Sequence, residues 1–217
     1  MSRKNAHKSK YRDDHQRTLI AQEAARIIHQ HGLTDFRAAK SKAADNLGLG
    51  QRGALPSNSE IAEAVAEHGR IFHEEQHSDL LKLQRQIAIY LMHKLGTFRP
   101  RLVGAVLSGN ITEHSPIELH VYSDTAEAVG MMLDAQGIAY QSGVRKHSIQ
   151  RGKPEDFPCY HFNEEDCLVK ATVFSERRQQ HAPLCPINGR PMQRAGLRDV
   201  ELLLANAEIS IASGTAH

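Results

Sequence analysis

The chain has 217 residues, a length that suits one domain of moderate size or a small domain with a helical appendage. Its 27 Lys and Arg residues nearly balance its 25 Asp and Glu residues, which excludes a global charge signal for nucleic acid or membrane surfaces. Three cysteines without C-x-x-C spacing, no apolar leader and no apolar run of roughly 20 residues predict a cytoplasmic protein with reduced thiols and no membrane partner.

The first half of the chain has a helical pattern. Residues 1–15 are polar and basic and predict a disordered arm, either a solubilising tail or a phosphate contact. Residues 16–97 carry apolar side chains at helical spacing and predict a helical region. Asp35 is the expected N-cap of its second helix, and a long helical stretch is expected from Ser57 to near Leu95.

The pattern changes after residue 97. Residues 98–207 predict a small domain with a mixed sheet, and residues 208–217 predict a frayed tail. Strands are expected over residues 101–107, 117–123, 138–141, 157–162 and 167–174, and helices over 125–136 and 197–207. A basic loop is expected over 142–156. The predicted fold class is therefore α+β, a helical N-terminal region followed by the sheet domain.

A zinc-protease motif occurs in the predicted long helix. Residues 73–77 read HEEQH and fit H-E-x-x-H, in which two histidines hold zinc and the glutamate polarises a water. The third ligand is missing, because Leu80 and Leu83 stand at the extended positions and no glutamate occurs between Glu75 and Glu113. We expect no zinc and keep a zinc metalloprotease as a remote alternative.

A second motif precedes and enters the predicted strand at 117–123. Residues 104–119 read GAVLSGNITEHSPIEL, which resembles without a gap the polymerase-β-like nucleotidyltransferase signature G-S-x-x-x-G-x-x-x-x-x-S-D-I-D-L. Gly104 and Ala105 stand where the signature has Gly-Ser, Gly109 matches its second glycine, and Ser115 matches its serine. From about residue 20 to 205 the chain is also similar to a bacterial family described as nucleotidyltransferase-like and uncharacterised.

The resemblance implies a nucleotide site. In that fold glycines let the backbone approach a triphosphate, and carboxylates on the next strand hold two Mg²⁺ ions that bridge the attacking and leaving oxygens. Carried over to this chain, the resemblance implies phosphate contacts at Gly104, Ala105, Gly109 and Ser115, and a catalytic, metal-binding carboxylate at Glu118. Mg²⁺ is the implied cofactor, and a nucleoside triphosphate or a nucleic acid is the implied partner.

The acidic motif departs from the family pattern. Pro116 replaces the first acid, and Lys170 occupies the later strand that normally carries a third acid. His120 shares a strand face with Glu118, as a substitute Mg²⁺ ligand or as a packed residue. We expect a nucleotide- or nucleic-acid-binding protein in which metal-dependent nucleotidyl transfer is weakened. The alternative is a non-catalytic protein- or RNA-binding scaffold that retains the fold.

Overall fold

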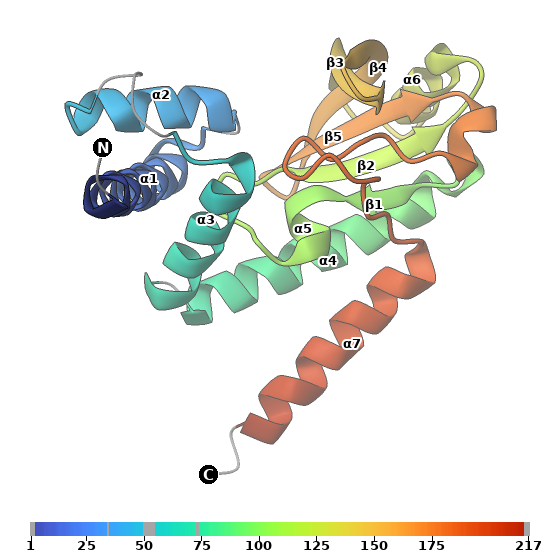
Figure 1. The fold of residues 1–217 in the computed structure, drawn as a ribbon. Coiled ribbons are helices and arrows are strands. Elements are labelled where there is room, and N and C mark those ends of the chain that lie inside the picture. The colour runs from blue at the N-terminus through green and yellow to red at the C-terminus, as the bar shows by residue number, and fades with distance from the viewer. Residues whose placement is uncertain (1–2, 34, 50–54, 73, 215–217) are drawn as a thin grey trace. The chain divides into compact units, whose positions relative to one another are not determined.

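The computed structural model describes residues 3–33, 35–49, 55–72 and 74–214 of the chain (Figure 1). Its helices are α1 (Arg3–His31), α2 (Phe36–Asn46), α3 (Asn58–Phe72), α4 (Glu74–Lys94), α5 (Gly104–Ser108), α6 (Ala126–Ala135) and α7 (Leu197–Gly214), with 3-10 turns η1 (Gly96–Phe98) and η2 (Glu176–Gln180). Its strands are β1 (Arg101–Val103), β2 (Ile117–Tyr122), β3 (Tyr140–Gln150), β4 (Lys153–Glu164) and β5 (Cys167–Phe174). The protein belongs to the α+β class, as the sequence predicts.

The chain divides into two compact units, and each is described by itself. Unit 1 comprises residues 1–77 and 111–114, and unit 2 comprises residues 78–110 and 115–217. Unit 1 contains α1, α2 and α3. They bury small and branched apolar side chains against one another, with Ile20, Ile27, Ala43 and Ile61 almost fully inaccessible to solvent. This burial removes apolar surface from water and is the main stabilisation of unit 1.

The N-terminus of α2 begins as the sequence predicts, whereas the N-terminus of α1 does not. The Asp35 side chain accepts a hydrogen bond from the Arg37 backbone N–H and caps α2. In contrast, α1 begins at Arg3, which corrects the disordered arm expected over residues 1–15. Residues 3–15 contain no Pro or Gly and several Lys, Arg and Ala residues, which favour the helix once its C-terminal half is packed.

Unit 2 is built on a five-stranded sheet, counted within the described residues, with strand order β1-β2-β5-β4-β3. The central pair β2 and β5 is parallel, and the other neighbouring strands are antiparallel. One sheet face carries Leu119, Ala171 and Tyr160, and the Tyr160 hydroxyl donates to the Ala126 carbonyl of α6. Helix α6 therefore lies on this face, and the opposite face carries Glu118.

Helix α4 belongs to unit 2 from Ser78 onward, whereas the sequence predicts one helical region that extends to residue 97. Its side chains bond to the segments around β1 and β2: Gln84 donates to the Ser115 carbonyl, and Arg85 donates to the Val106 carbonyl. Ile87 and Leu91 are buried on the same helix. The boundary between the units accordingly falls at residue 77.

Two strand predictions are corrected by the structure. The strand expected over 101–107 ends at Val103, because Gly104 has a φ of +73°, which breaks the extended chain and starts α5. The basic loop expected over 142–156 is instead the β3–β4 hairpin, with the turn at Arg151-Gly152. Strand β3 lacks a regular alternation of apolar and polar side chains, so its sequence gives no clear strand pattern. The tail expected over 208–217 is helical as far as Gly214.

The segment 184–195, which we call the strap, bridges the two edges of the sheet. Leu184 pairs with Ser148 of β3 and with Pro191, and Ala195 pairs with Leu102 of β1. The Leu102 and Ala195 backbones exchange two hydrogen bonds of 2.9 Å each. Because β1 and β3 are the edge strands, the strap pairs with backbone groups that the sheet leaves open.

The burial of β2 gives a direct test of the fold. Val103, Leu119 and Val121 are fully buried, as the sequence predicts. We expect Leu119→Ala to lower the free energy of unfolding by about 2–5 kcal/mol, because it removes buried methyl groups and leaves a cavity. Urea denaturation measures the change, and Leu202→Ala on the exposed side of α7 is the control, expected within about 0.5 kcal/mol of wild type. Equal effects from the two variants would contradict the described register.

Candidate functional site

The sheet face opposite α6 carries the candidate site. Glu118, His120 and Tyr122 alternate along β2 onto this face. The parallel register with β5 sets each beside a partner: Glu118 beside Lys170, His120 beside Thr172, and Tyr122 beside Phe174. On β4, His161 pairs with Lys170, and Cys159 pairs with Thr172. The face therefore changes along the strands from charged side chains to aromatic ones.

Gly104 lies directly against the Glu118 carboxylate. A Cβ atom at position 104 would overlap Glu118 Oε2 and would lie 3.2 Å from the carboxyl carbon. The position also has a φ of +73°, which side chains of L-residues rarely adopt. Glycine is therefore needed here for two reasons, and the structure brings together two residues, Gly104 and Glu118, that the resemblance assigns to one site.

An arginine from β3 pairs with Glu118. The distance between Arg145 Nη2 and Glu118 Oε1 is 2.5 Å, although β5 and β4 lie between β2 and β3 in the strand order. The sheet must therefore curl so that the β3–β4 hairpin faces β2. The Glu118 and Arg145 side chains are 15% and 32% exposed, so the ion pair is half-buried and reachable from solvent.

Two histidines pack behind this ion pair. His120 and His147 are both buried, and their ring centroids are 5.3 Å apart in an edge-to-face arrangement. Phe174 contacts both rings, at 4.6 Å from His120 and 5.4 Å from His147. Within the described part of the chain, neither His120 Nδ1 nor His147 Nε2 has a hydrogen-bond partner. The aromatic packing thus holds the hairpin against β2.

Burial and neighbouring cations keep these histidines neutral. Burial, and to a smaller extent the charge of Arg145, lower the pKa of His147 to about 4. The pKa of His120 lies well below its usual value, first through burial and then through His147, Arg145 and Arg194. The pKa of His161 is also lowered, by burial and by Lys170. At neutral pH the positive charge of this face therefore lies on Arg145, Lys170 and Arg194.

The other predicted phosphate-binding residues, Ala105, Gly109 and Ser115, make contacts with segments other than Glu118. Gly109 ends α5 with a φ of +83°, and its nearest side chains are Leu81 and Arg85 of α4. Ala105 follows Gly104 in α5, and the Ser115 carbonyl accepts the Gln84 amide. The structure thus explains Gly109 as a helix end, and among the predicted phosphate-binding positions it sets Gly104 beside the carboxylate.

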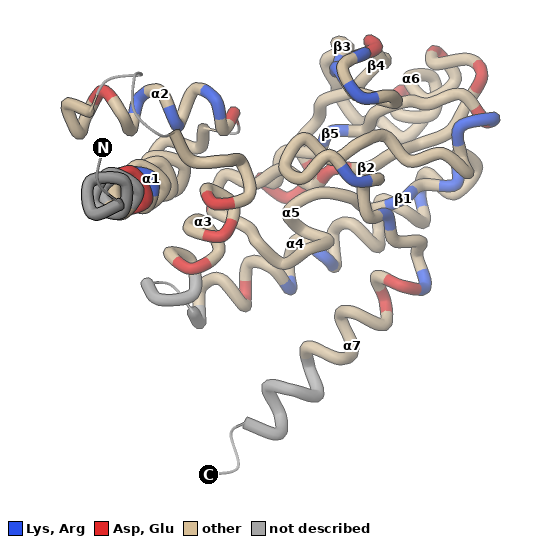
Figure 2. The backbone as a smooth tube through the Cα atoms, in the orientation of Figure 1, with Lys and Arg blue, Asp and Glu red and all other residues tan. Residues whose placement is uncertain are grey.

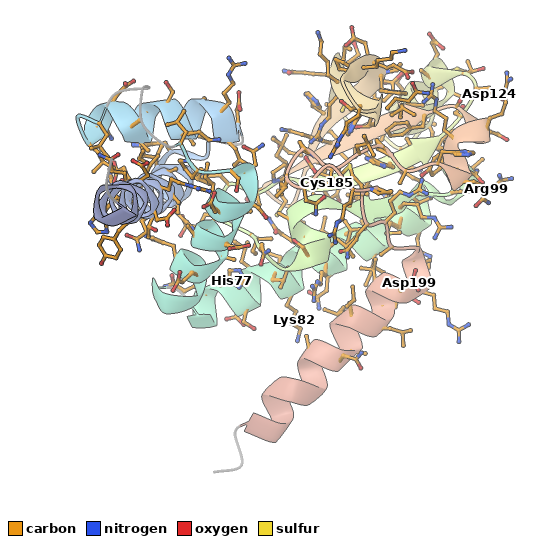
Figure 3. The ribbon with its side chains drawn as sticks, viewed as in Figure 1. His77, Lys82, Arg99, Asp124, Cys185 and Asp199 are labelled. Carbon is orange, nitrogen blue, oxygen red and sulfur yellow. The ribbon has the colours of Figure 1, made fainter. Side chains whose placement is uncertain are left out.

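Other acids near β2 and β5 in the sequence occupy different positions. Asp124 follows β2 and accepts a hydrogen bond from the Glu176 backbone N–H. Figure 3 labels Asp124 on the side of the sheet away from Cys185 of the strap. Glu165 and Asp166 form the β4–β5 turn, where both have positive φ. These positions explain why Glu118 stands as a single carboxylate beside Arg145 and Lys170.

The residues do not fit a two-magnesium centre. Mg²⁺ requires near-octahedral oxygen ligands, usually including more than one carboxylate. Glu118 is engaged by Arg145, while Pro116 offers no donor side chain and Lys170 is a cation. His120 offers a buried nitrogen rather than an oxygen. Among the described residues, His, Cys, Asp and Glu side chains form no group of three or more that could hold a metal ion.

Most of the zinc-protease motif lies outside the part of the chain that the structure describes. His73 lies outside the described residues, and so do the side chains of Glu74 and Glu75. His77 is described, and its Cδ2 atom would lie 3.6 Å from a Cβ added at Gly69. The sequence-based expectation that the motif holds no zinc stays a prediction.

Comparisons with known proteins assign no family to the chain. No protein-family model matches it, and no curated protein matches it. In the described part of the chain, none of the helices combines the length and the apolar character needed to cross a bilayer. The residues of the sheet face are therefore the basis for a functional proposal.

The two buried histidines generate a prediction about acid stability. The unfolded-state pKa of His147 is near 6.5 and its folded-state pKa is about 4, so the unfolded chain binds more protons between these values. The contribution is complete above pH 6.5 and is lost as the pH falls to 4, by roughly 3 kcal/mol for this group. Urea titrations at pH 7.0, 5.5 and 4.5 should show falling stability.

His147→Gln serves as the comparison, because it removes the titrating ring. The variant should lose less stability than wild type over the same pH interval, whatever its stability at pH 7. The carboxyl groups of Glu23 and Glu60 have pKa values near 2, so they contribute mainly below this interval and equally in both proteins. Parallel stability curves for the two proteins would show that His147 is not buried in a neutral form.

The contact between Gly104 and Glu118 generates a second prediction. Gly104→Ala should destabilise the protein by about 2–3 kcal/mol, because it combines backbone strain with displacement of the carboxylate. Gly137→Ala is the matched control, since Gly137 has a φ of +71° but no atom within 4 Å of an added Cβ. Adding Glu118→Ala to Gly104→Ala should recover part of the loss. No difference between the two glycine variants would refute the contact.

Proposed function

We propose that unit 2 binds a phosphate-bearing ligand, a nucleotide or a nucleic acid, on the sheet face around Arg145 and Lys170, without metal-dependent nucleotidyl transfer. The proposal is carried by one observation: the carboxylate that the resemblance assigns to metal binding is instead paired with Arg145 at 2.5 Å. Lys170 stands beside it in the strand register. Two cations therefore surround one carboxylate, and the excess charge attracts an anion.

The chemistry of these side chains favours phosphate. A guanidinium presents a planar fork of donors that matches the oxygens of a phosphate, and Lys adds a second point charge. Arg145 is about one-third exposed, and Lys170 is half-buried, so a ligand can reach both. His161 beside Lys170 is a further donor or acceptor on the same row. The lowered pKa of His161 keeps it neutral, so it contributes hydrogen bonds rather than charge.

Glu118 has a different role in this proposal from its role in a metal-dependent transferase. It occupies Arg145 in the free protein and is exchanged for the ligand phosphate, so it competes with the ligand. A transferase needs the same carboxylate to hold Mg²⁺, and its loss would weaken both ligand binding and turnover. Substitution of Glu118 therefore has opposite effects under the two mechanisms. The alternative of a scaffold for another protein requires no phosphate affinity at this face.

We predict that Glu118→Gln strengthens the binding of ATP in EDTA-containing buffer, measured by isothermal titration calorimetry. Arg145→Gln and Lys170→Gln should each weaken it by about 10- to 100-fold, the effect of one charge-assisted hydrogen bond. Lys146→Gln is the matched control, because Lys146 adjoins Arg145 on β3 but pairs with Asp156. Its affinity should equal that of wild type.

Two results would reject the proposal. ATP affinity that is unchanged in both Arg145→Gln and Lys170→Gln would place the ligand elsewhere or favour the scaffold. Transfer of label from a triphosphate to RNA or protein, dependent on Mg²⁺ and abolished by Glu118→Gln, would identify a working metal site instead. The same preparations serve both measurements, so a folding defect is detected by the urea titration described above.

A further inference from the structure

The β3–β4 hairpin and the strap carry an uneven distribution of charge. Residues 140–153 and the strap contain no Asp or Glu, and the acids that follow on β4, Glu155 and Asp156, are paired with Arg178 and Lys146. The basic side chains of the two segments are Arg145, Lys146, Arg151, Lys153, Arg190 and Arg194. The two segments are adjacent, because Ser148 and Leu184 form a β-bridge. Figure 2 shows Lys and Arg on the hairpin close to its turn.

Three of these side chains form an exposed group at the hairpin turn, which we call the tip triad. Arg151 begins the turn, Lys153 follows it, and all three members, including Arg190 of the strap, are exposed. The Arg151 guanidinium lies 3.9 Å from the position of a Cβ added at Gly189, which is next to Arg190. No ion pair involves the triad within the described residues, whereas Lys146 is paired with Asp156.

The tip triad lies at the end of the hairpin whose first strand, β3, carries Arg145. Arg151 lies six positions after Arg145 along the chain, which at about 3.3 Å per residue in a strand is roughly 20 Å. A triphosphate is much shorter than this distance, so a mononucleotide held at Arg145 leaves the triad without a partner. A polynucleotide chain carries a phosphate at every residue and covers the distance with several of them. The charges along the hairpin therefore match a repeating anion.

We propose that the ligand is a polynucleotide, one strand of which is held at one point by Arg145 and Lys170 and farther along its backbone by the tip triad of Arg151, Lys153 and Arg190. The inference rests on the proposed function and names its ligand class. Contacts to phosphates supply affinity without reading sequence. Each phosphate contact on a single strand releases counterions and lowers the slope of log affinity against log salt by about 0.7.

The test measures the binding of a fluorescein-labelled oligouridylate of about 15 nucleotides by fluorescence anisotropy. The salt concentration is varied between about 50 and 300 mM, a range in which log affinity falls roughly linearly with log salt. The tip variant is Arg151→Ala, Lys153→Ala, Arg190→Ala. The control variant is Arg37→Ala, Lys42→Ala, Arg198→Ala, which removes the same charge from exposed positions elsewhere. The tip variant should lose at least about tenfold in oligonucleotide affinity, and its salt slope should become shallower by about 2, from three lost contacts.

ATP distinguishes this inference from the proposed function. The tip variant should bind ATP as wild type does, while Arg145→Gln should weaken both ATP and the oligonucleotide. If the tip and control variants weaken the oligonucleotide equally, or if neither does, the tip triad is not a nucleic-acid surface and the proposed phosphate site still stands. If Arg145→Gln changes neither ligand, the proposed function itself fails.

A 15-residue polyglutamate peptide tests the ligand class. An acidic protein segment offers repeated anions of the same sign but lacks the phosphate geometry that favours bidentate contacts with Arg. It should compete at least tenfold less well than unlabelled oligouridylate. Equal competition, with the same dependence on the tip triad, would overturn the polynucleotide assignment in favour of an acidic protein partner.

Discussion

The parallel pairing of β2 with β5 is the constraint on which the rest of unit 2 depends. This register sets Glu118 beside Lys170 and Tyr122 beside Phe174, and a slip of β2 by one residue would turn Glu118 and Tyr122 to the helix-covered face. The same register buries Leu119 and Ala171 on the other side. Charge is thereby confined to one end of the strands, while the aromatic side chains at the other end support the curled hairpin.

The neutral state of the buried histidines avoids electrostatic repulsion with the cations of this face. A protonated imidazole beside Arg145 would add repulsion in a poorly hydrated place, and burial already disfavours the charged form. The packing of His120 and His147 with Phe174 instead gives the hairpin an uncharged support. Arg145 is then held over the sheet with its guanidinium at the surface. The geometry of the ion pair with Glu118 thus depends on buried aromatic side chains that are not part of the ion pair.

The sequence predicted the features that depend on neighbouring residues. The cap at Asp35, the alternation along β2 and the break between β4 and β5 depend on short segments of sequence. The block at 104–119 indicated Gly104 and Glu118 through a resemblance, and their direct contact is a finding of the structure. Arg145 was missed as a site residue because its segment was interpreted as a loop. Its role arises from the curl of the whole sheet, which no local pattern in residues 140–150 records.

The late position of the strap in the chain has a consequence for folding during synthesis. Ala195 completes the backbone pairing of β1, and Leu184 completes that of β3, yet both leave the ribosome after all five strands. A nascent chain that ends before the strap therefore exposes two unpaired strand edges, the surfaces through which incompletely folded proteins aggregate. Such long-range pairing also slows folding. Ribosome pausing before residue 184 would prolong this vulnerable state, and a chaperone acting on the nascent chain would find its binding surface there.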